Sequence, residues 1–284
     1  CIPYYTRVTE DHGSGADLVM EGEVYLMRGD SISAEIAYHR AAETATEKSQ
    51  FSILITAAFL WSRLAVLEGR DSEVFGPLKK LYTPLREAHQ YVLMPTLDMC
   101  LGWLYALLGR PDDAAAWLME DGADSAVLSP AKPMLEIIIS QLLLSSGSYS
   151  QVVARGHEIG ILCSQFNYLL CDIYQRLQTA SALFRLGRKD EGDELLLKAF
   201  EDALPDKIYL PFVEVDDQLI GYLAEKDNLH APELMELKNL SERFRKGLDK
   251  LGSPLRKYSE SPEVRPEWGL SRRELEIAVL AAGD

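Results

Sequence analysis

The chain has 284 residues, of which 47% are hydrophobic, so it is long and apolar enough to bury a large core, and a disordered chain is not expected. It carries 29 Lys and Arg against 44 Asp and Glu, which gives a formal net charge of -15 at pH 7. A surface this acidic repels nucleic acids and anionic membranes, and the chain as it stands is therefore a poor DNA binder.

From the N-terminal part onward, turn-like tetrads recur around five glycines. These are Gly29, Gly69, Gly109, Gly147 and Gly187, spaced 40, 40, 38 and 40 residues apart. Each glycine follows one apolar segment with helical spacing and precedes another, as expected for a left-handed residue just past a helix C-terminus. Asp30 and Asp71 suit the caps of the helices that follow, and Pro111 suits a first helical turn. We predict five helical hairpins over about 16–203 and a sixth pair that starts near Tyr209.

Two columns of small residues support this register. Seven residues before the glycines stand Gly22, Ser62, Gly102, Ser140 and Ala180, and five residues after them stand Ala34, Val74, Ala114, Val152 and Gly192. Small side chains on both helices of a hairpin let antiparallel partners approach closely. The columns resemble the tetratricopeptide pattern over roughly 17–227, although the period near 40 is longer than the usual ~34 and overlaps the HEAT and armadillo range. The predicted fold class is all-α, a right-handed superhelical solenoid of tetratricopeptide-like hairpins.

The longest uncharged run covers 137–154 and contains Gln, Ser and Gly residues. We therefore predict two soluble helices there and no membrane span. The four cysteines form no CxxC pair, and Cys163 and Cys171 lie in apolar stretches that favour packed, reduced thiols. From these thiols we expect a reducing, cytoplasmic location.

A second signal lies at the C-terminal end, in residues 270–284. The sequence Leu-Ser-Arg-Arg-Glu-Leu-Glu-Ile-Ala-Val-Leu-Ala-Ala-Gly-Asp resembles the opening of the LuxR-type helix-turn-helix domain. The matching positions are Leu270, Ser271, Arg273, Glu274, Glu276, Ile277, Ala282 and Gly283, whereas Ala278 departs from the usual Leu. Ser271 and Glu274 also form a capping box, which predicts a helix start at this point.

Upstream context points to the same family. Residues 208–223 resemble the segment that closes the helical-repeat region of MalT-like and other large LuxR-family regulators. In that family a repeat domain, a linker and a C-terminal helix-turn-helix follow in order. The resemblance implies a repeat domain at 1–228, a terminal helix at 229–250, a Pro-containing linker at 251–268 and a truncated start of the helix-turn-helix at 269–284. It also implies that the helix that enters the major groove lies beyond Asp284, so that DNA is bound only through the missing remainder.

A basic stretch at 243–257 either contacts phosphates beside such a domain or is the solvated end of the last helix.

The first helix of each pair in a helical-repeat stack usually lines the concave face. Six residues before the turn glycines stand Glu23, Arg63, Trp103, Gln141 and Ser181, and positions further back add Phe59, Met99, Met134 and Tyr174. Polar groups beside aromatic faces suit a sugar, a peptide or another small polar ligand. The predicted ligand-binding residues are Phe59, Arg63, Met99, Trp103, Gln141 and Tyr174. Alternatively the aromatic side chains of this set pack between hairpins, as we expect of Trp61 and Trp117.

No catalytic or cofactor motif is found in the sequence. GxxxxGK[ST] and GxGxxG are absent, and the five histidines form neither HExxH nor a Cys/His pair at metal spacing. The acidic pairs Asp112-Asp113 and Asp216-Asp217 are interpreted as a helix start and a solvated face rather than acid/base pairs. We therefore expect no catalytic residues, no metal and no cofactor, with an enzyme built on helical hairpins as the least favoured function.

Two function classes are favoured over that one. The first is the sensor and signalling repeat domain of a LuxR-family regulator, which binds a small effector or a partner protein or peptide on its concave face and controls a C-terminal DNA-binding domain. The alternative is a tetratricopeptide-type protein interaction scaffold with no DNA role. Homo-oligomerisation is left open. The chain's own C-terminal segment, carried by the 251–268 linker, is a further candidate occupant of the groove, which would make the protein autoinhibited.

Overall fold

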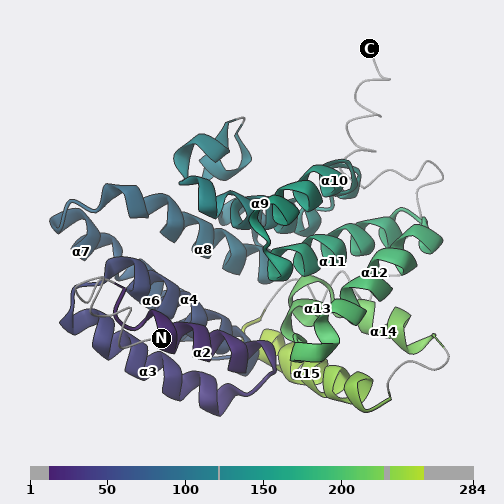
Figure 1. Cartoon of the computed structure of the whole chain (residues 1–284), viewed down its shortest axis with the longest axis horizontal. Coiled ribbons are helices and arrows are strands. Elements are labelled where there is room, and N and C mark those ends of the chain that lie inside the picture. The colour runs from purple at the N-terminus through teal and green to yellow at the C-terminus, as the bar shows by residue number, and fades with distance from the viewer. Residues whose placement is uncertain (1–12, 121, 227–230, 253–284) are drawn as a thin grey trace.

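The computed structural model describes residues 13–120, 122–226 and 231–252. Every regular element in these ranges is a helix, so the all-α class is confirmed. In Figure 1 the chain starts with α2, α3 and α4 at the lower left, continues through α8, α9 and α10 above them, and turns down through α11 and α12. It then returns, so that α13 and α15 pack against α2 and α4.

Three of the predicted hairpins are pairs of continuous helices. They are α2 (Ala16–Met27) with α3 (Ser31–Glu47), α9 (Lys132–Ser145) with α10 (Tyr149–Phe166), and α11 (Leu169–Arg185) with α12 (Lys189–Ala203). The uncharged run at 137–154 is divided between α9 and α10 by the turn at Gly147, as predicted. Asp30 caps α3, since its side chain accepts a hydrogen bond from the Ser33 N–H at 3.1 Å.

The turn glycines have the predicted backbone conformation. All five have a positive φ, from 67° at Gly109 to 79° at Gly147. Glycine adopts this left-handed region without the steric cost that a Cβ brings, which is why it ends these helices. In the first hairpin the small residues allow the close packing that was expected, because a Cβ on Gly22 of α2 would lie 3.2 Å from Ala37 Cβ and 3.7 Å from the Ala34 carbonyl oxygen of α3.

The second and third pairs depart from a regular hairpin, because their second helices are broken. After α4 (Phe51–Glu68) come α5 (Asp71–Val74), α6 (Gly76–Lys79), α7 (Tyr82–Glu87) and η1 (Tyr91–Leu93). After α8 (Met94–Leu107) come η2 (Pro111–Asp113), η3 (Ala116–Met119), η4 (Ala123–Ala126) and η5 (Ser129–Ala131). Pro77, Pro84 and Pro130 each lack the N–H that a continuous helix needs, and Gly122 has a φ of 85°.

The remaining elements bring the chain back to its start. They are η6 (Leu204–Asp206), α13 (Leu210–Val215), α14 (Leu219–Ala224) and α15 (Ala231–Lys250). The Tyr209 N–H at the start of α13 donates to the Met27 carbonyl of α2 at 2.9 Å. From α15, Leu237, Leu240 and Phe244 are buried in the core. The predicted helix-turn-helix start, and the predicted linker from residue 253 on, lie outside the described residues.

The described part of the basic stretch is bonded within the chain. Arg243 donates to the Gly29 carbonyl and to Glu68, each at 2.8 Å, and Arg245 pairs with Asp217 at 2.7 Å. Lys250 donates to the Glu68 carbonyl at 3.1 Å. These cations therefore fasten α15 to the first two hairpins and to the loop before α14.

By length and composition α4 could cross a membrane, and it is the one described helix that could. Most of its residues between 55 and 67 are buried against neighbouring helices, Trp61 among them. A mostly buried apolar helix is also what the central helix of a soluble protein looks like. Trp117 is partly buried against the same core, and its indole N–H donates to Asp98 at 2.9 Å.

Candidate functional site

The structure brings the predicted ligand-binding residues together, but in the interior. Arg63, Met99, Trp103, Gln141 and Tyr174 are between 3% and 5% exposed, and only Phe59 is less deeply buried. They lie on the first helices of four successive pairs, and those that form polar bonds face α13 rather than an open groove. Ligand binding by these residues stays a prediction, since in this structure α13 of the same chain occupies the positions where a ligand would bind Arg63 and Gln141.

Four side chains from four helices form the centre of this region, which we call the inner-face cluster: Glu23 of α2, Arg63 of α4, Tyr174 of α11 and Glu214 of α13. Arg63 donates from Nε and Nη2 to the two carboxylate oxygens of Glu214, at 2.9 and 2.8 Å. Its Nη1 donates to Glu23 at 2.9 Å. The Tyr174 hydroxyl accepts from Arg63 Nη2 at 2.8 Å and donates to Glu214 at 2.5 Å. The two parallel bonds between Arg63 and Glu214 are the strong, planar form of an arginine–carboxylate pair.

Burial sets the electrostatics of the inner-face cluster. The side chains of Arg63 and Glu214 are 5% and 1% exposed. Burial raises the pKa of the Glu23 carboxyl, although Arg63 acts against this shift. Burial and the nearby Glu214 carboxylate raise the pKa of Tyr174 well above its usual value, so its hydroxyl stays protonated and donates. Burial disfavours the charge on Arg63, but the Glu214 and Glu23 carboxylates act against burial, and the pKa of Arg63 is raised well above the ordinary value.

Other members of the predicted column contact the same segment. Gln141 Nε2 donates to the carbonyls of Glu214 and Val215, both at 3.3 Å. Ser181 donates to Asp216 at 2.7 Å. The Trp103 ring packs edge-on against the Tyr174 ring, with centroids 5.2 Å apart. Arg63, Gln141, Tyr174 and Ser181 thus share one partner, which is α13 with the residue that follows it.

Glu214 is the member that the sequence analysis missed. It lies in an apolar segment, Leu-Pro-Phe-Val-Glu-Val, all six residues of which are buried. A lone carboxylate inside such a segment requires a buried cation, and this signal was present in the sequence. Asp216, interpreted as part of a solvated acidic pair, is partly buried and bonded to Ser181 and Arg185, so that interpretation is wrong for Asp216.

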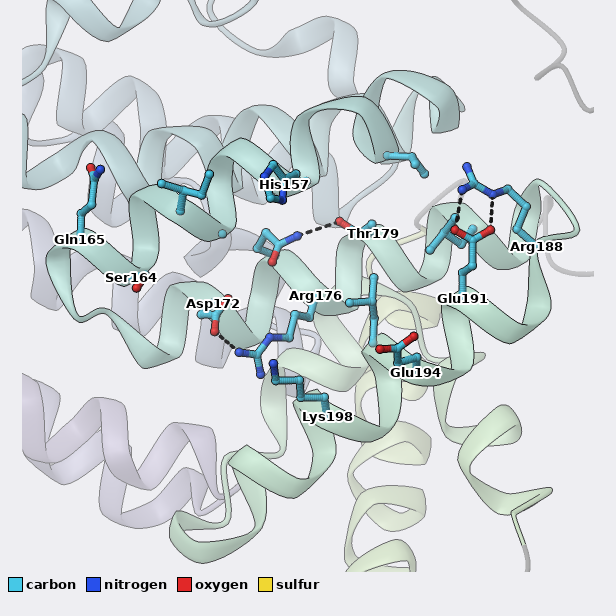
Figure 2. A pocket seen from close by; sticks show the side chains of 17 residues that line it. His157, Ser164, Gln165, Asp172, Arg176, Thr179, Arg188, Glu191, Glu194 and Lys198 are labelled. Atoms are coloured by element: carbon cyan, nitrogen blue, oxygen red, sulfur yellow. Dashed lines mark hydrogen bonds and ion pairs between the residues drawn. The ribbon is translucent and has the colours of Figure 1, made fainter.

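An open groove lies on the opposite face of α11, between α10 and α12 (Figure 2). The α11 residues that line it, among them Asp172, Arg176 and Thr179, are about half a helical turn from Tyr174 and Ser181. The groove has a volume of about 810 Å³ and is lined by Val153, Gly156, His157, Gly160, Ile161, Ser164, Gln165, Asp172, Gln175, Arg176, Thr179, Leu183, Arg188, Glu191, Glu194, Leu195 and Lys198.

The charges of the groove are largely paired. Arg176 binds both Asp172 and Asp202, and Arg188 binds Glu191 with two bonds of 2.7 and 2.6 Å, as Figure 2 shows for Asp172 and Glu191. The Gln175 amide donates to Thr179 at 3.0 Å at the bottom of the groove. Such a surface offers charged groups of both signs together with hydrogen-bond donors and acceptors. It suits a polar ligand or a peptide and favours neither anions nor cations.

The three cysteines that the structure describes are poorly placed for chemistry. Cys100, Cys163 and Cys171 are buried and free. Burial raises the pKa of Cys100 and of Cys171 to about 12 and that of Cys163 to about 11, so the reactive thiolate is disfavoured at neutral pH. In the described part of the chain, no group of three His, Cys, Asp or Glu side chains is placed to hold a metal ion.

No protein-family model, curated protein or solved structure matches this chain.

Proposed function

We propose that this chain is the sensor and signalling region of a LuxR-family transcriptional regulator. In this proposal the glycine-turned pairs form a right-handed superhelix of tetratricopeptide-like repeats in the cytoplasm. The concave face of this superhelix, which we call the inner face because it carries the inner-face cluster, binds a small effector or a partner protein. Its occupancy controls a DNA-binding domain that begins at 269–284. Three buried free cysteines fit a reducing compartment.

One observation carries this proposal: polar side chains from the first helices of three helix pairs, Arg63, Gln141 and Tyr174, all bind a single short segment, α13. A signalling domain needs an element whose position depends on what occupies its binding face. The polar bonds of Arg63, Tyr174 and Gln141 to α13 support the choice of that helix as the element.

A physical connection runs from α13 toward the C-terminal end. Helix α13 packs against α15, and the residues just after α13 also bind α15 through the Asp217–Arg245 pair. Residues 251–284 follow α15 in the sequence. A displaced α13 would remove part of the surface on which α15 rests, which is how occupancy of the inner face would change the orientation of the DNA-binding domain.

The test is a gel-shift measurement with the promoter region of the protein's own gene. The full natural gene product is compared with a version that ends at Asp284. We expect a DNA complex, weakened by salt, only for a product that carries residues beyond Asp284. If no form of the natural product binds DNA, the regulator proposal is wrong.

The second candidate is a protein interaction scaffold without a DNA role. It is favoured by the groove between α10 and α12, which is open without displacement of any element. In this case the gel shift is negative, and substitutions on the groove, such as Lys198→Glu, abolish partner capture while Arg63 variants that remain folded do not.

A further inference from the structure

We propose that Arg63 and Tyr174 form a receptor for the glutamate of a short helical partner segment, and that α13 occupies this receptor as an internal competitor. The inference rests on the proposed function, because it names the chemistry of the inner-face ligand. The ligand is a protein segment with one glutamate between large apolar residues, as α13 itself shows with Glu214 between Val213 and Val215.

The receptor is built by elements other than α13. Glu23 of α2 holds Nη1 of Arg63 at 2.9 Å, which orients the guanidinium so that Nε and Nη2 point to the incoming carboxylate. The Tyr174 ring is packed against Trp103 of α8, and the Tyr174 hydroxyl lies 2.8 Å from Arg63. Donors that are fixed before the ligand arrives lose little freedom on binding, so the site is preorganised for a carboxylate.

The present occupant is a short element. Helix α13 has six residues, is preceded by Lys207 at a φ of 56°, and is followed by Asp216 in an extended conformation. So short a helix is not stable on its own in water, and α13 is helical because the surface beneath it holds it there. An element of this kind exchanges for a matching segment more readily than one of the long hairpin helices does.

A protein segment fits this receptor better than a small carboxylate does. Leu210, Phe212 and Val213 of α13 are at most 2% exposed, so the receptor includes an apolar surface beside the charged one. A small carboxylate would replace the bonds of Glu214 and leave that apolar surface uncovered, whereas a segment with the α13 pattern replaces both. It must also compete with a tethered segment, whose effective concentration is on the order of millimolar.

The test uses a fluorescein-labelled peptide with the sequence of 208–217, whose binding to the whole chain is followed by fluorescence polarisation. The matched control peptide has Gln in place of the glutamate that corresponds to Glu214. The two proteins are the wild-type chain and Glu214→Gln, in which the internal competitor has lost its charge. We expect the glutamate peptide to bind Glu214→Gln at least tenfold more tightly than wild type, and at least tenfold more tightly than the control peptide does.

A second measurement covers the case in which Glu214→Gln does not fold. Hydrogen exchange of the wild-type chain is recorded with excess glutamate peptide. The amides of α13 should exchange faster with the peptide present, while those of α11 stay protected. Equal binding of the two peptides, or no binding and no change in α13, overturns the proposal. A wild-type dimer that exchanges α13 between copies would overturn the assignment to a separate partner.

The two proposals fail separately. If the peptide does not bind but the gel shift is positive, the glutamate-receptor proposal is wrong and the regulator proposal stands. If the peptide binds but the gel shift is negative, the regulator proposal is wrong, and the glutamate receptor belongs to an interaction scaffold.

Discussion

Arg63 of α4 and Glu214 of α13 are joined by two parallel hydrogen bonds of 2.9 and 2.8 Å, although 151 positions separate them in sequence. The pair is buried, and it connects the second hairpin with the segment that follows the fifth. Buried ion pairs contribute little net stability compared with well-packed apolar residues, so retaining one at the centre of the fold favours specificity or switching as its use.

Removal of the Arg63 guanidinium should strongly destabilise the protein. In Arg63→Met, Glu23 and Glu214 would both be left in the interior without their cation, and breaking a buried pair in this way costs roughly 3–5 kcal/mol. The free energy of unfolding is measured by urea titration followed by circular dichroism. The control is Arg188→Met, whose pair with Glu191 is exposed to solvent, so this variant should keep a free energy of unfolding close to that of wild type. Equal losses in the two variants would contradict the assignment of Arg63 as a buried charge.

The pH dependence of stability should reveal Glu23. Its pKa is raised in the folded protein above the ordinary value of 4.5, mainly by burial, so the folded state holds this proton more tightly than the unfolded state. The stability linked to Glu23 is therefore fully present below its unfolded pKa and is lost as the pH rises through its folded pKa. The measurement compares urea unfolding of wild type and Glu23→Gln at several pH values from acidic to neutral. Relative to wild type, the variant should gain stability as the pH rises above about 4.5. A constant difference would show that the Glu23 carboxyl has the same pKa in both states.

Much of the inner face could be predicted because local rules determine it. Each turn glycine needs a left-handed conformation, and a fixed count back from Gly69 or Gly147 reaches Arg63 or Gln141 on the corresponding side of its helix. That α13 covers this side could not be read from periodicity, since it depends on how far the stack of helices turns before the chain returns. The breaks after α4 and α8 were foreseeable in part, because Pro77, Pro84 and Pro130 interrupt those segments.

The buried cysteines should be unreactive in the folded protein. Cys100, Cys163 and Cys171 are shielded, and the pKa of each thiol is raised by burial to about 11 or 12. With a chromogenic thiol reagent at pH 7, these three thiols should react only as fast as the protein unfolds, and all at once in urea. Mass spectrometry of the labelled chain identifies the sites. Rapid labelling of Cys163 or Cys171 in native conditions would show that α10 and α11 separate locally.

Gly247 of α15 should not tolerate a side chain. A Cβ at this position would lie 2.3 Å from the Val66 carbonyl oxygen and 2.6 Å from that of Leu67, both backbone atoms of α4 that cannot move aside. We expect Gly247→Ala to lower the free energy of unfolding by about 1–3 kcal/mol and to loosen α15 from α4, seen as faster hydrogen exchange in α15. The control is Gly221→Ala in α14, where nothing lies within 4 Å of the new Cβ. Because alanine is the better helix former, that variant should be unchanged or more stable by about 0.5–1 kcal/mol. If both variants keep wild-type stability and α15 exchanges as before, the close packing of α15 on α4 is wrong, and with it the route by which α13 would reach the C-terminal end.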